Sequence, residues 1–204
     1  MSTDKNTTYD FDLLEKIKKG DRKSFENLFD KYYKRLCLFS YNLQHNRESA
    51  EEIVADVLAN LWIKKNALNI SLNLKSYLFK AVKNRSLNYL KTSHGSNINL
   101  IQLDDIELIA NEKADNSVLG SEIREQIDDI IKLMPPKRQV VFRLNRIEGF
   151  KYKEIGEIMN ISERTVQNHM VEAIRFTSQF YPKFKMIMSS LMFFLAGCLS
   201  SLFI

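Results

Sequence analysis

The strongest constraint on the fold lies in residues 150–180, where two short helical patterns are separated by a polar break. Asn160 tolerates the left-handed backbone that often ends a helix, and Ser162 is a favoured helix N-cap. Ile161 and Val166 occupy the two positions of a hydrophobic staple around that cap. The pattern predicts a sharp turn between two helices, which is the arrangement of a helix-turn-helix.

The second of these helices is predicted to have one buried and one exposed face. Helical spacing places four residues on the inner face: Val166, Met170, Ala173 and Ile174. Four others fall on the outer face: Arg164, Asn168, Val171 and Arg175. Because Arg pairs with guanine and Asn with adenine in a major groove that admits a helix, we expect the outer face to contact duplex DNA. The alternative is an ordinary solvent-exposed face.

Composition favours an all-α protein, since the 204 residues include only six Gly and three Pro and show little β-branched alternation. The net charge of +5 is unevenly distributed. Residues 1–91 carry 17 basic and 11 acidic side chains, residues 92–120 carry 1 and 5, and residues 121–204 carry 12 and 9. Two basic segments around an acidic one suit a protein that contacts phosphate in two places.

Three helices are predicted in the N-terminal half: one from Phe11 to about Cys37, one across 48–62, and one from Leu74 to about Lys91. The third carries a basic face with interleaved aromatic residues, formed by Tyr77, Phe79, Lys80, Lys83, Asn84, Leu87, Tyr89 and Lys91. Aromatic rings beside cations suit single-stranded nucleic acid, whose bases stack on the rings. The alternative is that the rings are core, which we favour for Phe79 or Tyr89 taken alone.

The second half of the chain begins with a polar, acidic linker across 92–120. A helix from Ser121 is predicted to end at Met134, because proline disfavours a helical residue before it. Pro136 suits the first turn of the next helix, which is predicted to stop at Gly149. We therefore expect four segments: a helical domain over 1–91, the linker over 92–120, a helix-turn-helix domain over 121–185, and an apolar tail over 186–204.

No catalytic, metal or cofactor site is predicted. Cys37 and Cys198 are far apart in sequence, and the three histidines are scattered, so neither a disulfide framework nor a zinc site is indicated. The chain has no Gly-rich phosphate loop and no nucleophile with an acid–base pair. The polar N-terminus has no secretory signal. We expect a cytoplasmic protein that is not an enzyme and needs no cofactor.

The motifs resemble those of RNA polymerase sigma factors of the extracytoplasmic-function (ECF) group. In the N-terminal half, AEEIVADVLANLW (50–62) and LKSYLFKAVKNRSLNYLK (74–91) resemble the domain that binds polymerase and opens the −10 element. In the C-terminal half, MPPKRQVVFRLNRIEGFKYKEIGEIMNISERTVQNHMVEAI (134–174) resembles the domain that recognises the −35 element. The resemblance implies two helical domains, with core RNA polymerase, promoter DNA and an anti-sigma factor as partners.

The resemblance also implies roles for individual residues. Contacts with polymerase fall on Glu52, Asp56 and Asn60. Capture of the melted −10 strand falls on the loop 65–71 and on Tyr77, Lys80, Lys83, Asn84, Arg85 and Lys91. Contacts with the −35 element fall on Arg164, Thr165, Gln167, Asn168, His169, Val171 and Arg175. Lys151 stands where the family usually has a capping Ser or Thr, which predicts a less well capped helix start.

Residues 186–204 contain no charged side chain and are rich in Leu, Phe, Met and Ile. A helix of this length would measure about 28 Å, close to the hydrocarbon thickness of about 30 Å. The segment could therefore span a membrane, but its four serines weaken that interpretation. The alternative is a tail packed on the C-terminal domain or on a partner such as an anti-sigma factor.

A second function remains open at this point, namely a helix-turn-helix transcriptional regulator of the response-regulator type. Such a protein recruits polymerase instead of joining it. It needs an N-terminal sensory or receiver domain, which usually contains β-strands. The helical patterns across 1–91 favour the sigma factor.

Overall fold

The computed structural model describes residues 5–67, 73–94 and 128–179, and every regular element in those ranges is a helix. The all-α prediction is therefore confirmed. Four predicted segments lie wholly or partly outside the described residues: the loop at 68–71, the linker at 95–120, the helix from Ser121 as far as residue 127, and the tail 186–204. The expectations placed on them there are not tested.

The first two helices, α1 (Lys5–Lys18) and α2 (Arg22–Gln44), occupy the stretch for which the periodicity predicted one helix. Gly20 separates them with a φ of 87°, a conformation that costs little without a Cβ. Asp21 then caps α2, because its carboxylate accepts hydrogen bonds from the Lys23 amide at 3.2 Å and the Ser24 hydroxyl at 2.6 Å. The prediction of a single helix from Phe11 was wrong at this Gly-Asp turn.

The next helices follow the predicted pattern. Asn46 begins α3 (Arg47–Ile63) by accepting a hydrogen bond from the Ser49 amide at 2.9 Å. A short 3₁₀ turn, η1 (Lys65–Ala67), follows α3, and α4 (Leu74–His94) is the predicted third helix. Helix α2 packs against both α3 and α4. Phe79 is fully buried in α4, with its ring centroid 5.0 Å from that of Phe39, so its interpretation as a core residue is confirmed.

Helix α1 is fastened to α2 by a buried polar contact. Asp10 is almost completely buried, and its carboxylate accepts hydrogen bonds from the Tyr32 hydroxyl and from Lys31 Nζ. Burial and the neighbouring carboxylate raise the pKa of Tyr32, so the phenol remains a hydrogen-bond donor. The contact joins the two helices at a buried position.

The C-terminal domain contains α6 (Pro136–Arg146), α7 (Tyr152–Met159) and α8 (Glu163–Ser178). Residues 128–132 are helical, and this helix ends before Pro135, as predicted. Gln139 secures this junction, because its amide nitrogen donates to the carbonyl oxygens of Met134 at 2.8 Å and Lys132 at 3.1 Å. These bonds satisfy carbonyl groups that the proline turn leaves without helical partners.

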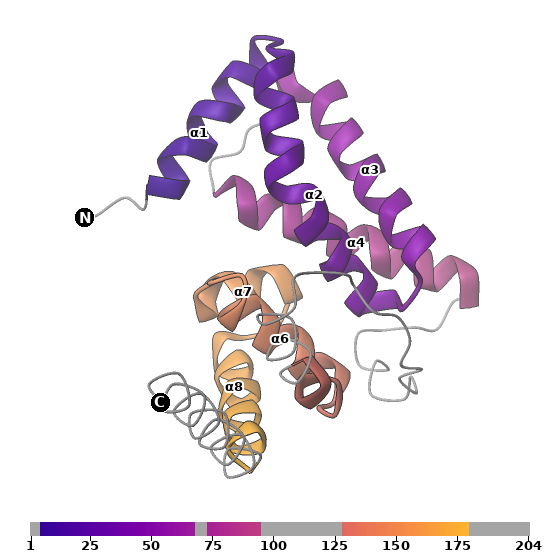
Figure 1. Ribbon diagram of the computed structural model, residues 1–204, viewed down its shortest axis with the longest axis vertical. Helices are drawn as coiled ribbons and strands as arrows, with labels where there is room; N and C mark the ends of the chain where they lie inside the picture. The colour runs from indigo at the N-terminus through magenta and orange to yellow at the C-terminus, as the bar shows by residue number, and fades with distance from the viewer. Residues whose placement is uncertain (1–4, 68–72, 95–127, 180–204) are drawn as a thin grey trace, which may run out of the picture.

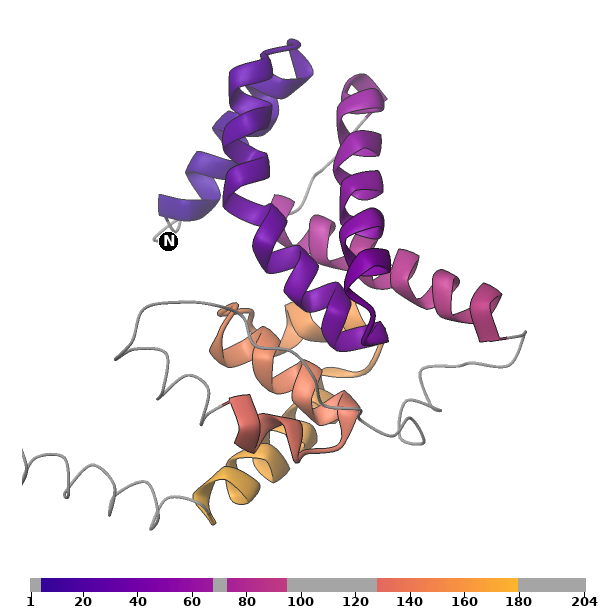
Figure 2. The same cartoon turned by 45° about the vertical axis from the view of Figure 1, so that its right-hand side comes forward.

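The two groups of helices are in contact. Helices α6 and α7 lie beside α2 and α4, and α8 lies on the side of α6 and α7 that faces away from the N-terminal helices (Figures 1 and 2). Buried side chains from α1–α4 and from α6–α8 form one continuous apolar cluster. The arrangement leaves the outer surface of α8 and one side of α4 exposed.

Candidate nucleic-acid interface

The turn between α7 and α8 has the predicted geometry. Asn160 adopts the left-handed conformation (φ 59°, ψ 46°) at the end of α7. Ser162 caps α8, with its hydroxyl accepting a hydrogen bond from the Thr165 amide at 3.0 Å. Gly156 allows the close approach of the turn, since a Cβ there would lie 2.8 Å from the Ile161 carbonyl oxygen. These contacts confirm the predicted turn between the two helices.

The start of α7 is stabilised differently from the usual cap. The Lys151 side chain makes no capping bond, as the sequence predicted. The Glu154 carboxylate instead accepts a hydrogen bond from the Lys151 amide at 2.8 Å. This is one of the two hydrogen bonds of a capping box, and it is present although Lys151 has no hydroxyl that could form the other.

Helix α8 buries one face and exposes the other. Val166 and Met170 are fully buried in the apolar cluster that includes α6 and α7, and Ala173 is fully buried beside Ile131 and Met134, as expected. The prediction that Ile174 packs inward was wrong: 44% of its surface is exposed, because it lies at the margin of the inner face. The exposed residues from the predicted −35 set are Arg164, Gln167, Asn168, Val171 and Arg175, and Thr165 and His169 are half-buried beside them.

Thr165 and Arg175 of this set make side-chain contacts with neighbouring residues of the domain. The Thr165 hydroxyl lies 2.7 Å from that of Ser162, and Arg175 forms an ion pair of 3.0 Å with Glu172. Arg164, Gln167 and Asn168 project from the first two turns of α8. The base-contacting end of a recognition helix is its N-terminal part, so these three residues are well placed for it.

The predicted −10 face of α4 is mostly exposed. Tyr77, Lys80, Asn84, Arg85 and Lys91 all present their side chains to solvent. Lys83 does not, because only 5% of its surface is exposed. Burial lowers the pKa of Lys83, and the nearby charges of Lys80 and Lys91 lower it further. The expectation of a basic face running the length of α4 is therefore wrong at Lys83.

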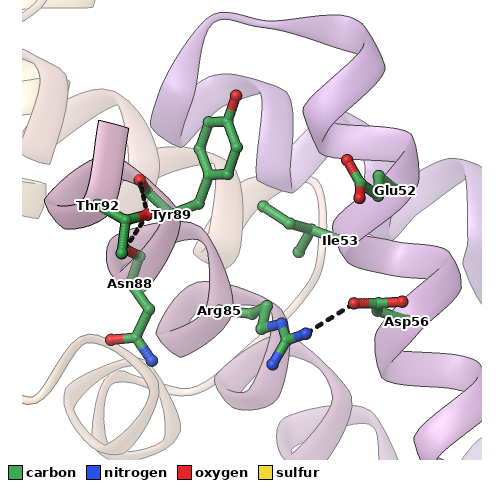
Figure 3. Close-up of a pocket in the computed structure, with 7 residues that line it drawn as sticks. All are labelled: Glu52, Ile53, Asp56, Arg85, Asn88, Tyr89 and Thr92. Atoms are coloured by element: carbon green, nitrogen blue, oxygen red, sulfur yellow. Dashed lines mark hydrogen bonds and ion pairs between the residues drawn. The ribbon is translucent and has the colours of Figure 1, made fainter. Parts of the chain in front are cut away.

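A groove runs between α3 and α4, with a hollow of about 300 Å³ at one end. Figure 3 shows Asp56 from α3 and Arg85 from α4 pointing toward one another across it, with 2.7 Å between Oδ2 and Nη2. The hollow is lined by Glu52, Ile53, Asp56, Arg85, Asn88, Tyr89 and Thr92. It brings predicted polymerase contacts and a predicted DNA contact together in one place.

A second hollow of about 200 Å³ continues the groove past Arg85. It adds Asn60 from α3 and Tyr77 and Asn84 from α4 to the lining. Sequence reasoning missed Asn88 and Thr92, which follow Asn84 and Arg85 at helical spacings and line the same groove. Their helical spacing from Asn84 and Arg85 was the sequence pattern that could have placed them on the same face of α4.

Neither a metal site nor a membrane-spanning helix is found within the part of the chain that the structure describes. There, no group of three or more His, Cys, Asp or Glu side chains could hold a metal ion. No helix among those residues is both long and apolar enough to cross a membrane.

Two models of one protein family match the chain on either side of the linker. The model for sigma-70 region 2 matches residues 28–94, and the model for sigma-70 region 4 matches residues 124–176. Together they cover more than half of the sequence, in the order expected. The chain belongs to the sigma-70 family of RNA polymerase sigma factors.

Relatives of this sigma factor are named as members of the ECF group. The chain is 22% identical over 165 residues to the ECF RNA polymerase sigma factor SigW of Bacillus subtilis, covering 77% of this chain and 88% of the relative. It is 24% identical over 173 residues to the ECF RNA polymerase sigma-E factor of Escherichia coli K12, covering 79% and 88%.

A solved structure supports the fold of the sigma factor. The sigma factor RpoE of Bartonella quintana, in complex with the anti-sigma factor NepR, matches with a TM-score of 0.57 at 19% identity. The match covers 78% of this chain and 98% of the other. The response-regulator alternative loses support, because the residues described in the N-terminal half (5–67 and 73–94) contain no strand.

Proposed function

We infer that this sigma factor directs core RNA polymerase to promoters, and we propose which surfaces perform each step. Helix α8 enters the −35 major groove, α4 with the groove beside it holds the melted −10 strand, and α3 binds polymerase. The proposal rests on two exposed helix faces, one in each family region. Helix α8 exposes side chains that can hydrogen-bond to bases, and α4 exposes cations together with Tyr77.

At the −35 element, Arg164, Gln167 and Asn168 contact base edges. All three are exposed on the first two turns of α8, and Arg and Asn side chains pair bidentately with guanine and adenine. Thr165 and His169 flank them as phosphate contacts. Val171 and Arg175 follow on the outer face and extend the contact along the DNA.

At the −10 element, Tyr77 offers a ring on which an unpaired base stacks. Lys80 and Lys91 supply charge to the phosphates, and Asn84 and Arg85 hydrogen-bond to the strand. Tyr77, Asn84 and Arg85 line one continuous groove, which a flipped base can enter. Lys83 contributes less than its neighbours, because its side chain is buried.

Polymerase binds the side of α3 that carries Glu52, Asp56 and Asn60. These residues lie at four-residue intervals, so they form one line along the helix. Glu52 and Asn60 are exposed, and Asp56 is half-exposed beside Arg85. Catalysis belongs to the polymerase, and the sigma factor supplies promoter selection.

An anti-sigma factor is proposed as a further partner. The similar RpoE of Bartonella quintana was solved with the anti-sigma factor NepR. The tail 186–204 lies outside the described residues, and we propose that it controls the availability of the protein, by docking on protein or contacting a membrane. A full-length protein that remains wholly soluble at low salt without detergent would contradict membrane contact.

Run-off transcription with purified core polymerase tests the proposed function. Addition of the protein is expected to yield promoter-specific transcripts from a library of genomic promoters. The absence of any such transcript, with a protein that is folded by circular dichroism, would overturn the proposal.

A further inference from the structure

The C-terminal domain contains a small apolar cluster that is only partly covered. Its fully buried members are Ile131, Met134 and Ala173, so the cluster joins the segment before α6 to the second half of α8. The rings of Phe142 and Phe176 pack against these residues and are themselves half-buried. We call these five residues the Ile131 cluster.

Apolar side chains continue from the Ile131 cluster onto the surface. Leu133 is 64% exposed, and Ile130 is half-buried. Both lie in the last turn before Pro135, where the Leu133 amide donates to the Ile130 carbonyl oxygen at 3.3 Å. Ile130 and Met134 are four residues apart, so they share one face of that turn. The apolar surface therefore extends from a buried cluster out to solvent, and a surface of this kind marks a site of contact.

The charged residues around this turn are paired with one another. Arg143 of α6 lies 2.7 Å from Asp128, and Lys132 lies 3.0 Å from Asp129. Asp128, Asp129 and Lys132 belong to the same helical segment as Ile130. Because each of these charges already has an opposite charge beside it, the surroundings of the cluster favour an uncharged occupant over an acidic or basic one.

Residues 186–204 have the chemistry of such an occupant, since they contain no charged side chain. When the segment is projected onto a helix at about 100° per residue, it has two distinct faces. The aliphatic face holds Ile187, Met188, Leu191, Met192, Leu195, Leu199 and Leu202. The opposite face holds all four serines, with other residues: Ser189, Ser190, Ser200, Ser201, Ala196, Gly197, Phe193 and the two ends Met186 and Ile204.

This two-faced pattern favours docking on protein over insertion in a membrane. A helix that spans a membrane meets hydrocarbon on every side and is apolar all round. A helix that docks on a protein buries one face and leaves the other in water. The gathering of all four serines on one face fits the docked helix, whose aliphatic face then needs an apolar surface to cover it.

The chain is able to bring this segment to the Ile131 cluster. Phe176 lies three residues before Gln179, the last described residue. Residues 180–185 connect it to the segment, and a stretch of this length reaches at most about 20 Å. Pro182 disfavours a helical residue before it, so a change of direction after α8 is expected here. A tether this short gives a high effective concentration, so even a modest contact forms.

We propose that residues 186–204 form a helix that packs its aliphatic face on the Ile131 cluster and on Leu133, as an additional helix of the C-terminal domain. The occupant of the surface is the chain's own segment, in place of a lipid bilayer, a second copy or another protein. The inference narrows the role proposed above for the tail. It concerns the free protein, so it is tested without polymerase.

Thiol alkylation of the full-length protein tests the contact. Leu133→Cys, combined with Cys37→Ala and Cys198→Ser, leaves one thiol on the apolar surface, and mass spectrometry follows its reaction with N-ethylmaleimide. The pair Leu191→Asn and Leu195→Asn disrupts the aliphatic face. This pair is expected to accelerate alkylation roughly tenfold, because a contact formed in about 90% of molecules leaves only the open fraction reactive.

Matched variants control the measurement. Ser190→Asn with Ser201→Asn introduces the same side chain twice on the opposite face and is expected to leave the alkylation rate unchanged. Lys153→Cys, at an exposed position of α7, replaces Leu133→Cys as a second probe and is expected to respond to neither pair. Far-UV circular dichroism shows whether the helices are intact. With intact helices, an alkylation rate that the aliphatic-face pair does not change would overturn the proposal.

The Leu133→Cys probe also distinguishes the other occupants. Slow alkylation that appears only at high protein concentration would assign the surface to a second copy. Alkylation that becomes fast when phosphatidylcholine–phosphatidylglycerol vesicles are added, with the protein floating in the vesicle fraction, would assign the tail to the membrane. Either result would overturn the proposal, which expects slow alkylation in dilute protein with or without vesicles. Slow alkylation together with failed run-off transcription would remove the proposed function and leave this inference in place.

Discussion

Asp56 and Arg85 form an ion pair across the groove between α3 and α4, with 2.7 Å between carboxylate and guanidinium. Their side chains are 49% and 54% exposed, so solvent screens the pair. Exposed pairs of this kind contribute about 0–1 kcal/mol to stability. The pair therefore links a proposed polymerase contact to a proposed DNA contact without being needed for the fold.

Substitution at either end of this pair should separate the two activities. Asp56→Asn is expected to weaken core polymerase binding, measured by fluorescence anisotropy, and Arg85→Gln to weaken binding of a single-stranded −10 oligonucleotide by the polymerase complex. Both should change the free energy of unfolding by less than about 1 kcal/mol. Arg47→Gln, which breaks an exposed ion pair on α3 with Glu51, is the control. Equal loss of both activities in both variants would contradict the assignment.

Arg164→Ala and Asn168→Ala should change which −35 sequences are transcribed. A bidentate base contact discriminates by about 1–3 kcal/mol, so each variant should relax preference at one or two positions. Transcription from a library of randomised −35 elements measures this. Lys153→Ala, on the exposed side of α7, should keep the wild-type preference. The base-contact assignment fails if the Arg164 and Asn168 variants select the same sequences as wild type.

Lys80 and Lys83 are expected to behave differently although they lie one helical turn apart. Lys80→Ala removes an exposed phosphate contact, so the slope of log affinity against log salt should decrease by about one. Lys83→Met should leave that slope nearly unchanged. It should also raise the free energy of unfolding, because burial of the ammonium lowers the pKa of Lys83 and the thioether carries no such cost. A salt slope that falls equally in both variants would show that Lys83 reaches phosphate.

His45 gives the fold a predictable pH dependence. Burial lowers the pKa of His45 in the folded protein below its ordinary value of 6.5. Between the lowered and the ordinary pKa the unfolded chain binds more protons, so the free energy of unfolding decreases as the pH falls through that window. Asn also tolerates the left-handed backbone found at this position (φ 55°), so His45→Asn should fold and should lose part of this dependence. Urea unfolding at pH 7.5 and pH 5.5 measures the difference, and an unaltered difference in the variant would exclude His45 as its source.

The left-handed turn at Asn160 should tolerate glycine but not a β-branched residue. Asn160→Val is expected to lower the free energy of unfolding by about 1–2 kcal/mol, because a left-handed backbone brings the Cβ close to the following carbonyl oxygen. Asn160→Gly should be close to neutral. Thermal unfolding followed by circular dichroism compares the two. Equal loss in both variants would point to the Asn160 side chain instead of its backbone.

The turn between α7 and α8 could be predicted because its determinants are local. Asn160 and Ser162 determine the backbone conformation and capping of residues next to them in sequence, so their residue types were sufficient to predict the turn. The break at Gly20 was equally local, but the apolar periodicity that continues on both sides concealed it. Lys83 was misplaced because its spacing puts it between two faces of α4, and packing by other helices decided its burial.

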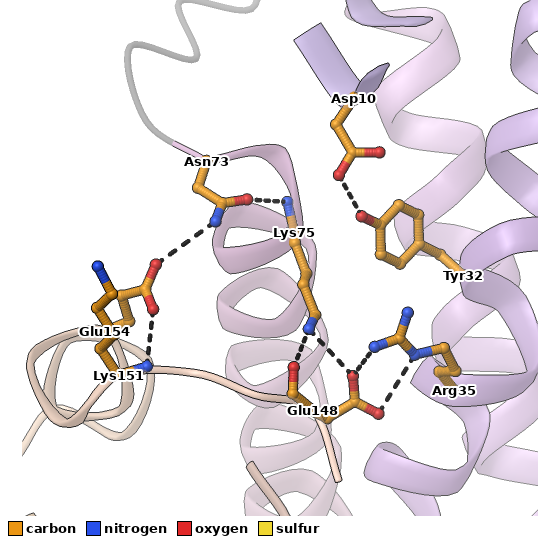
Figure 4. A network of polar contacts seen from close by, with 8 residues as sticks. All are labelled: Asp10, Tyr32, Arg35, Asn73, Lys75, Glu148, Lys151 and Glu154. Carbon is orange, nitrogen blue, oxygen red and sulfur yellow. Dashed lines mark hydrogen bonds and ion pairs between the residues drawn. The ribbon is translucent and has the colours of Figure 1, made fainter. Parts of the chain in front are cut away.

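The contact between the domains could not be predicted from local pattern. Glu148 and Phe150 lie in a short turn between helices. In such a turn no periodic pattern indicates whether a charged or an aromatic residue contacts a distant part of the chain. Their partners Arg35, Lys75 and Phe79 lie 71 to 113 residues away in the sequence. Only the folded chain shows that residues in the α6–α7 turn contact side chains of α2 and α4 (Figure 4).

The apolar cluster that continues from α1–α4 into α6–α8 determines how the free chain unfolds. Two domains with separate cores melt independently, each with its own midpoint. Here the rings of Phe79 and Phe150 belong to both domains, so loss of either domain exposes apolar surface on the other. The free protein is therefore expected to melt as one cooperative unit, with a single midpoint for both groups of helices.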